Sequence, residues 1–280
     1  MILPQWPAPE NVKALATERE IYPLGTPPVK HLGISLPPYD RFNLGDHVGD
    51  NPDHVRVNRQ QLLECSGLFT ESSGCYEIRW LQQIHGIKCL DASLIPNGTQ
   101  ADACFTQQRQ LACAIMTADC LPILFCDLQG RQVAAAHAGW RGLADGVLEQ
   151  TLNSFKKNGI AADHIIAWMG PAITQSAFEV GPEVQQAFML FKSGEKWADD
   201  GCFVAGKGDR LQANLYRLAK LQLESLGVAG VYGGDESFCT FDAQVDGAQT
   251  GTKNEYNQSR FFSYRREAIT GRQASLIWLA

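Results

Sequence analysis

Three apolar segments of strand length follow one another in the middle of the chain. They are LACAIMTA (111–118), LPILFC (121–126) and QVAAAHAG (132–139), and the turn DLQG (127–130) separates the last two. Strands with this near-continuous apolar character are buried on both faces, unlike strands that alternate apolar and polar residues. The segments therefore predict the central strands of a sheet that other layers cover on both sides.

The flanking sequence predicts a mixture of helices and further strands. Apolar residues recur at three-four spacing from Leu143 to Phe155, with Gly159 as the expected C-terminal cap. The first forty residues read as largely irregular. Further helices are expected at 53–63 and 211–226, and further strands at 76–80, 164–170, 177–181, 228–232 and 273–280. Strands and helices mix without regular β-α-β alternation, which favours an α+β fold. No linker or repeat divides the 280 residues, so a single domain spanning 1–280 is expected.

Composition and charge exclude several classes of protein. The net charge is −6 and no Lys/Arg cluster is present, which argues against nucleic-acid binding. The longest apolar stretch, 111–126, is interrupted by polar residues and a proline, so we expect no membrane span. The N-terminal residues do not have the pattern of a signal peptide, and the nine cysteines form no Cys-x-x-Cys pair. These features predict a cytoplasmic protein with reduced thiols.

Three potential metal ligands stand at the ends of predicted strands. His137 ends the third apolar segment, Cys120 lies between the first two, and His85 follows the strand at 76–80. Taken singly, each side chain has a simpler explanation as a buried or turn residue. Two histidines and one cysteine on neighbouring strands would instead form a catalytic zinc site, because such sites use three protein ligands and keep a fourth position open.

Other side chains are candidates for supporting roles. Asp119 is a charged residue in an apolar region and could orient a metal ligand, and Arg141 stands at a predicted helix N-terminus suited to anions. Both are assigned catalytic roles. The remaining candidates, all expected to contact substrate, are Asn43 and His47 in a Gly- and Asp-rich loop, Gln83 beside His85, and Arg265 among aromatic residues.

The segments that carry these residues resemble a known family. They are FNLGDHVGDNPDHVRVNRQQL, WLQQIHG, ADACFT, TADCLPILFCD, AAAHAGWRG, GPAI with FEVG, and FFSYRRE with TGRQASLIWL. Together they resemble the bacterial laccase-domain family, also called the polyphenol-oxidase or peptidoglycan-editing-factor family. The resemblance runs from residue 42 to the C-terminus and assigns the family's metal ligands to His85, Cys120 and His137. The polar stretch 241–259 is longer than the resemblance leads us to expect.

The resemblance implies a four-layer α/β/β/α sandwich with mixed sheets. It also implies a metal-dependent purine nucleoside phosphorylase that acts on adenosine, inosine, guanosine and methylthioadenosine and also deaminates adenosine. Zinc is the expected metal, with copper as the alternative. A nucleoside and phosphate are the expected partners, and a monomer or homodimer is the expected assembly.

Two other activities stay open. One is a cysteine hydrolase in which His137 activates Cys120, for example on a peptidoglycan precursor. The other is weak copper-dependent polyphenol oxidation. True laccase chemistry needs many histidine ligands, whereas this chain has six histidines and no His-x-His pair.

Overall fold

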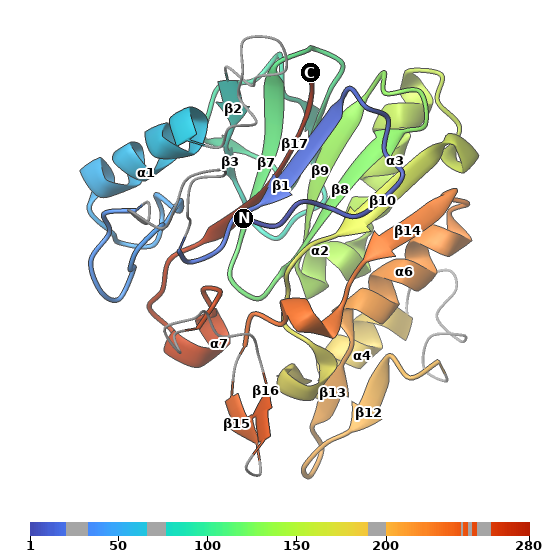
Figure 1. The fold of residues 1–280 in the computed structure, drawn as a ribbon. Coiled ribbons are helices and arrows are strands. Elements are labelled where there is room, and N and C mark those ends of the chain that lie inside the picture. The colour runs from blue at the N-terminus through green and yellow to red at the C-terminus, as the bar shows by residue number, and fades with distance from the viewer. Residues whose placement is uncertain (21–32, 66–76, 190–199, 242, 246–247, 251–258) are drawn as a thin grey trace.

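Two β-sheets form the centre of the molecule (Figure 1). The computed structural model describes residues 1–20, 33–65, 77–189, 200–241, 243–245, 248–250 and 259–280. The first sheet has four strands, in the order β1 (Val12–Ala16), β17 (Gln273–Leu279), β7 (Leu111–Thr117) and β2 (Glu77–Arg79). The second has six, in the order β14 (Gly230–Gly233), β10 (Ile165–Met169), β8 (Leu121–Asp127), β9 (Val133–Ala138), β6 (Ala103–Thr106) and β4 (Cys89–Asp91).

The sheets pack face to face, and helices cover their outer faces. On β7, Cys113 and Ile115 pack into the apolar cluster between the sheets, whereas Ala114 packs on the opposite side with Leu62 of α1 (Pro52–Cys65). This is the two-residue period of a strand. In Figure 1, α1 lies on one side of the strands and α3 (Val147–Lys157) and α6 (Leu215–Ser225) lie on the other. The predicted four-layer α/β/β/α sandwich is confirmed.

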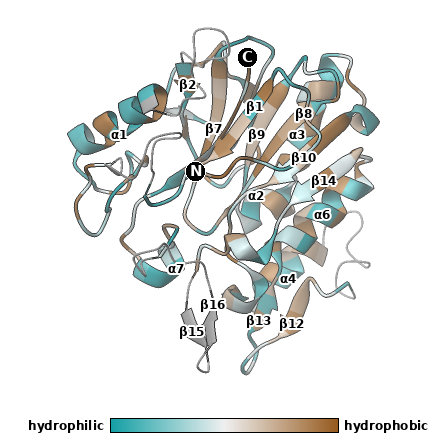
Figure 2. Ribbon diagram, viewed as in Figure 1, coloured by the Kyte–Doolittle hydropathy of each residue, from teal (hydrophilic) through white to brown (hydrophobic). Residues whose placement is uncertain are grey.

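The three apolar segments are the most deeply buried strands. Every residue of β7, β8 and β9 is buried, and Figure 2 shows apolar colouring along these strands. They lie in different sheets, however, because the chain crosses from the four-stranded to the six-stranded sheet between β7 and β8. The turn at 118–120, which includes Cys120, makes this crossing.

Smaller elements complete the fold. The other α-helices among the described residues are α2 (Trp140–Asp145), α4 (Pro182–Met189) and α7 (Tyr264–Glu267). A small three-stranded sheet has the order β11 (Glu179–Val180), β13 (Leu211–Ala213) and β12 (Phe203–Ala205). Two further sheets have two strands each: β3 (Leu81–Gln82) pairs with β5 (Thr99–Gln100), and β15 (Ala243–Val245) pairs with β16 (Ala248–Thr250). No helix among the described residues is long and apolar enough to cross a membrane.

Three sequence-based predictions of local structure were wrong. The first forty residues contain β1, which pairs along its whole length with β17 at the other end of the chain. The helix expected from Leu143 to Phe155 is divided into α2 and α3 at Gly146, whose φ of +100° is left-handed. The helix expected from Leu211 begins only at Leu215, because the Asn214 side chain caps its N-terminus.

The polar segment 241–259 is only partly among the described residues. Its described part forms the β15–β16 hairpin, which projects at the lower edge of the molecule in Figure 1. Residue 242 and the ranges 246–247 and 251–258 lie outside the described residues.

Candidate metal centre and adjoining pocket

The three predicted ligands converge. The donor atoms of His85, Cys120 and His137 lie within 4.8 Å of one another. Cys120 Sγ is 3.8 Å from Nε2 of His85, and the two imidazole rings meet edge to face with centroids 4.8 Å apart. Across the described ranges, no other group of three or more His, Cys, Asp or Glu side chains converges in this way.

The pairing of β8 with β9 brings Cys120 and His137 together. Pro122 pairs with His137 and Leu121 with Ala138, which places Cys120 beside Gly139 just past the ends of these strands. A Cβ added at Gly139 would lie 2.9 Å from Cδ2 of His85 and 3.2 Å from Sγ of Cys120. Only a glycine leaves room for both side chains at this point.

Backbone conformation is unusual at two positions of the centre. His85 has a φ of +61° and Asp119, next to Cys120, has a φ of +91°. Non-glycine residues adopt this region at a cost of about 1–3 kcal/mol and are found preferentially at functional sites. The surrounding contacts must hold both residues in place, since the local sequence alone would not favour these conformations.

Asp102 supplies these contacts for the histidines. Its carboxylate accepts a hydrogen bond from Nδ1 of His137 at 2.8 Å. It also accepts backbone N–H bonds from Ile84 (3.2 Å), His85 (2.9 Å) and Gly86 (2.7 Å). One fully buried carboxylate therefore fixes both the His137 ring and the loop that carries His85. Sequence reasoning assigned this kind of role to Asp119 and missed Asp102. The signal was available: Asp102 is a charged residue within the apolar segment ADACFT.

The electrostatics of the centre favour a thiolate. Burial alone would raise the pKa of the Cys120 thiol, but His137 and His85 lower it to about 6. Burial likewise acts to lower the pKa of His137, whereas Cys120 and Asp102 raise it to about 9. A thiolate with two imidazoles is a donor set that suits zinc and also copper. The side chains present thus fit a transition metal.

The centre forms part of the wall of a pocket of about 280 Å³, called the inner pocket. Of the predicted substrate contacts, His47 and Gln83 line it. The described residues that line it are His47, Gln83, His85, Met116, Thr117, Ala118, Cys120, His137, Tyr264 and Arg272. The amide of Gln83 bonds both backbone groups of Met116, donating to O and accepting from N at 2.8 Å each, and so ties the wall to β7.

Asp119 and Asn43 serve as supports. The carboxylate of Asp119 accepts bonds from the Thr240 hydroxyl and the Arg265 backbone N–H, both at 2.7 Å, instead of bonding a ligand candidate. Asn43 is fully buried, and its Oδ1 accepts the backbone N–H of Arg272 at 2.8 Å while its Nδ2 donates to Asp50 and Gly45. With its amide used within the protein, Asn43 positions Arg272 and does not reach the pocket.

The inner pocket is lined by an arginine that sequence reasoning did not select. Arg141 is exposed and stacks on the Trp140 ring, and Arg265 is exposed and donates to the carbonyl of Glu179 at 3.0 Å. Neither lines the pocket. Arg272 does, half-buried and with its pKa lowered by burial. The sequence feature that could have pointed to Arg272 is its position in TGRQASLIWL, directly before the strand β17.

Comparisons with known proteins agree with this picture. The family model for multi-copper polyphenol oxidoreductase laccases matches residues 28–280. The purine nucleoside phosphorylase YfiH of Escherichia coli K12 is 44% identical over 280 residues, covering 100% of this chain and 98% of the relative. The purine nucleoside phosphorylase PA4543 of Pseudomonas aeruginosa is 42% identical, covering 99% and 98%.

Solved structures show the same fold. The crystal structure of protein NMB0706 of Neisseria meningitidis aligns with a TM-score of 0.81 at 42% identity, covering 99% of this chain and 98% of that one. The hypothetical protein YfiH of Bacillus licheniformis aligns with a TM-score of 0.75 at 25% identity, covering 96% and 93%.

Proposed function

This chain belongs to the multi-copper polyphenol oxidoreductase laccase family, and we propose that it is a metal-dependent purine nucleoside phosphorylase that also deaminates adenosine. The observation that carries the proposal is the convergence of His85, Cys120 and His137 on the inner pocket. The names of its relatives supply the reaction. The proposed substrates are adenosine, inosine, guanosine and methylthioadenosine, with phosphate as the second reactant.

His85, Cys120 and His137 would hold the metal, with zinc as our first choice and copper as the alternative. A catalytic zinc site typically has three protein ligands. When bound, the metal supplies Lewis-acid chemistry to the pocket. Asp102 accepts a hydrogen bond from Nδ1–H of His137, so the unprotonated Nε2 is the nitrogen that would bind the metal.

Phosphorolysis requires a phosphate oxygen to form a bond to C1′ of the ribose while the bond from C1′ to the purine nitrogen breaks. The products are ribose 1-phosphate and a base that leaves with a proton. Arg272 is the cation in the pocket wall that could hold the phosphate. The side chain of Asn43 holds the backbone of Arg272 in place. Gly45 leaves space for the aliphatic part of the Arg272 side chain, since a Cβ at Gly45 would lie 2.7 Å from Cγ of Arg272. Tyr264 and His47 are the ring-bearing side chains available for contact with the nucleoside.

Deamination of adenosine replaces the amino group at C6 with oxygen from water and releases ammonia. In this proposal the reaction uses the same pocket, which must then admit water. Asp119 acts as a positioning residue for both reactions, because its bonds to Thr240 and Arg265 hold the turn that carries Cys120.

A cysteine hydrolase is the second candidate, and one observation favours it. Cys120, His137 and Asp102 have the order of a nucleophile, base and orienting carboxylate, and the pKa of Cys120 is lowered to about 6. The position of His85 argues for the metal instead. A catalytic triad has no use for a second imidazole nitrogen 3.8 Å from the sulfur. Laccase chemistry is less suited still, because the described residues offer donors for a single site.

The decisive experiment separates phosphorolysis from hydrolysis. Zinc-loaded protein is incubated with each nucleoside in phosphate and in phosphate-free buffer, and the products are identified by chromatography and mass spectrometry. We expect free base and ribose 1-phosphate only when phosphate is present, with about one zinc per chain by elemental analysis. Equal cleavage without phosphate would make the enzyme a hydrolase, and an active protein without metal would favour the cysteine mechanism.

A further inference from the structure

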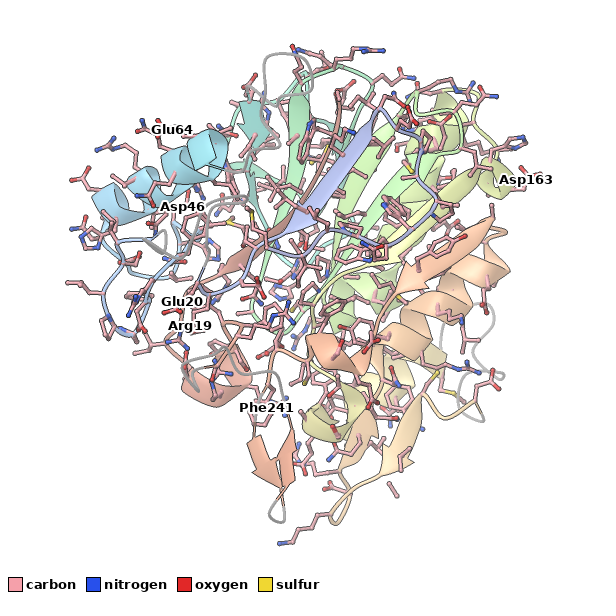
Figure 3. All side chains as sticks on the ribbon, viewed as in Figure 1. Arg19, Glu20, Asp46, Glu64, Asp163 and Phe241 are labelled. Atoms are coloured by element: carbon pink, nitrogen blue, oxygen red, sulfur yellow. The ribbon has the colours of Figure 1, made fainter. Side chains whose placement is uncertain are left out.

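A second pocket adjoins the inner pocket. It has a volume of about 340 Å³ and is called the outer pocket; its lining is Asp46, His47, Arg59, Trp80, Leu81, Gln82, Asn97 and Gly98. His47 lines both pockets, and Gln82 of the outer pocket directly precedes Gln83 of the inner one. Asp46, labelled in Figure 3, marks this region beneath α1. The inner pocket alone, at about 280 Å³, is slightly smaller than the roughly 300–1,000 Å³ typical of small-molecule sites. A ligand that extends along His47 could occupy both pockets.

The outer pocket holds several hydrogen-bond donors that the protein does not use. Arg59 donates from Nε and Nη2 to the carbonyl of Leu44, and Nη2 also contacts Asp46 at 3.2 Å, but Nη1 has no partner among the described residues. Asn97 uses Oδ1 to accept the Trp80 backbone N–H, and its exposed Nδ2 group has no partner among the residues that the structure describes. The exposed amide of Gln82 likewise has no partner in the described part of the chain.

The guanidinium of Arg59 is held rigidly and is poorly solvated. It lies 4.3 Å from the centroid of the Trp80 ring, and its side chain is only 19% exposed. Burial lowers its pKa in spite of the opposing effect of Asp46. Asp46 pairs with Nη2, but its own side chain is 58% exposed, so this ion pair is weak. The free N–H groups therefore call for an acceptor-rich, negatively charged ligand group.

We propose that the outer pocket is a subsite for a phosphate group esterified to the substrate, so that the enzyme binds nucleoside monophosphates as well as free nucleosides. The proposal rests on the proposed function, since it assumes that the nucleoside occupies the inner pocket. The ester phosphate contacts Nη1 of Arg59 and the amides of Gln82 and Asn97. The reacting inorganic phosphate stays in the inner pocket with Arg272.

Direct binding tests the subsite without relying on turnover. Calorimetry on the metal-loaded protein compares adenosine with its 2′-, 3′- and 5′-monophosphates. At least one regioisomer is expected to bind about tenfold or more tightly than adenosine, as a charge-assisted bond to phosphate would give. Its identity shows which hydroxyl faces the outer pocket. If no monophosphate binds more tightly than adenosine, the proposal is wrong.

Two isosteric variants test whether the ester phosphate binds in the outer pocket. Gln82→Glu and Asn97→Asp each replace a donor amide with a carboxylate, and the latter retains Oδ1 for the Trp80 N–H. Each is expected to lower the ratio of monophosphate affinity to adenosine affinity by about tenfold. Gln100→Glu is the matched control: it is exposed and pairs with Gln82 across β3 and β5 but does not line the pocket. The control should leave the ratio within about twofold, because Gln100 does not line the pocket that holds the ester phosphate and its exposed charge is largely screened.

The binding and activity measurements distinguish failure of the phosphate subsite from failure of the phosphorylase assignment. If Arg272→Gln abolishes the preference for monophosphate while Gln82→Glu leaves it intact, the phosphate sits in the inner pocket and the subsite proposal fails. If the preference depends on Gln82 and Asn97 but no nucleoside is cleaved in phosphate buffer, the subsite stands and the phosphorylase assignment fails.

Discussion

Asp102 and His137 are joined twice, through side chains and through main chains. The carboxylate of Asp102 accepts the Nδ1 hydrogen bond at 2.8 Å, and its backbone carbonyl accepts the His137 backbone N–H at 2.7 Å. The second bond is an extension of the ladder between β6 and β9, in which Ala103 pairs with Ala136. The orientation of this histidine is therefore built into the six-stranded sheet.

Asp102→Asn is expected to weaken metal binding by about ten- to a hundredfold. With its oxygen kept toward the backbone N–H groups of Ile84 and Gly86, an asparagine would point its NH₂ group at Nδ1 of His137 and at the His85 backbone N–H. The ring would then carry its proton on Nε2, where it cannot bind a metal. Zinc affinity is measured by competition with a chromophoric chelator, and melting temperature in the absence of metal reports on the fold.

Asp119→Asn is the matched control for charge. It also removes one carboxylate near the centre, but the bonds it perturbs go to Thr240 and Arg265. The amide can keep both bonds, because its oxygen can accept the Arg265 N–H while its NH₂ group donates to the Thr240 hydroxyl. The turn that carries Cys120 then stays in place, so we expect zinc affinity to change by less than about threefold. Equal losses in the two variants would show that net charge matters and that the orientation of His137 does not.

Gly139→Ala is expected to lower zinc affinity by at least about tenfold. The backbone at Gly139 (φ −61°, ψ 153°) accepts alanine without strain, but the new Cβ would lie 2.9 Å from the His85 ring and 3.2 Å from the Cys120 sulfur. The methyl group must push at least one ligand candidate out of place. The same chelator competition measures the effect. Unchanged affinity would mean that the metal does not need the observed positions of His85 and Cys120.

The buried central strands and the metal ligand candidates could be predicted from the sequence because both have local patterns, whereas the four-layer arrangement was expected from the family resemblance. The apolar runs at 111–139 predicted buried strands, and the ligand candidates stand at the ends of such strands. By contrast, β1 depends on pairing with β17, from Val12 with Leu279 to Ala16 with Ser275, and five residues of sequence do not reveal a partner so far along the chain.

The choice of supporting residues could not be made from the sequence for a similar reason. Asp119 and Asp102 are both carboxylates in apolar segments, and only the three-dimensional arrangement shows which of them faces His137. Arg141, Arg265 and Arg272 each stand beside a glycine or an aromatic residue. Which arginine lines the pocket depends on long-range contacts, such as the bond from Arg272 N to the Asn43 side chain.

Arg272→Gln is expected to raise the KM for phosphate by roughly ten- to a hundredfold, the loss of one charge-assisted bond worth about 1.5–3 kcal/mol. The KM for adenosine should change less, because the guanidinium is assigned to the phosphate. Steady-state kinetics at varied phosphate and nucleoside concentrations separate the two constants. Arg141→Gln is the control, since this arginine is exposed and does not line the pocket. If Arg141→Gln has the larger effect, the anion-binding role that the sequence suggested for Arg141 is correct after all.

Asp127→Asn is expected to destabilise the protein at neutral pH and to do so less in acid. Burial acts to raise the pKa of Asp127, but bonds from Arg131 and the backbone N–H of Gln132 lower it below its ordinary value. A lowered pKa in the folded state adds stability above the unfolded pKa of about 3.9, and this stability is lost as the pH falls through the folded value. Because Arg131 is 47% exposed, the backbone bonds contribute most of an expected 1.5–3 kcal/mol at pH 7. Urea unfolding from pH 7 to pH 3 should show the two proteins converging; a constant difference would contradict this account.

The reactivity of Cys120 separates a metal ligand from a nucleophile. A zinc-bound thiolate has its electron pairs engaged, so iodoacetamide should label Cys120 slowly until a chelator is added, and loss of activity should follow loss of metal. Cys89 provides an internal control: burial raises its pKa to about 12, so its labelling should stay slow throughout. Peptide mass spectrometry follows both cysteines while a dye reports released zinc. A thiolate activated only by His137, with its pKa lowered to about 6, would react rapidly in protein that is active without metal. That result would overturn the metal assignment and favour the cysteine hydrolase, because the nucleophile would then be free during turnover.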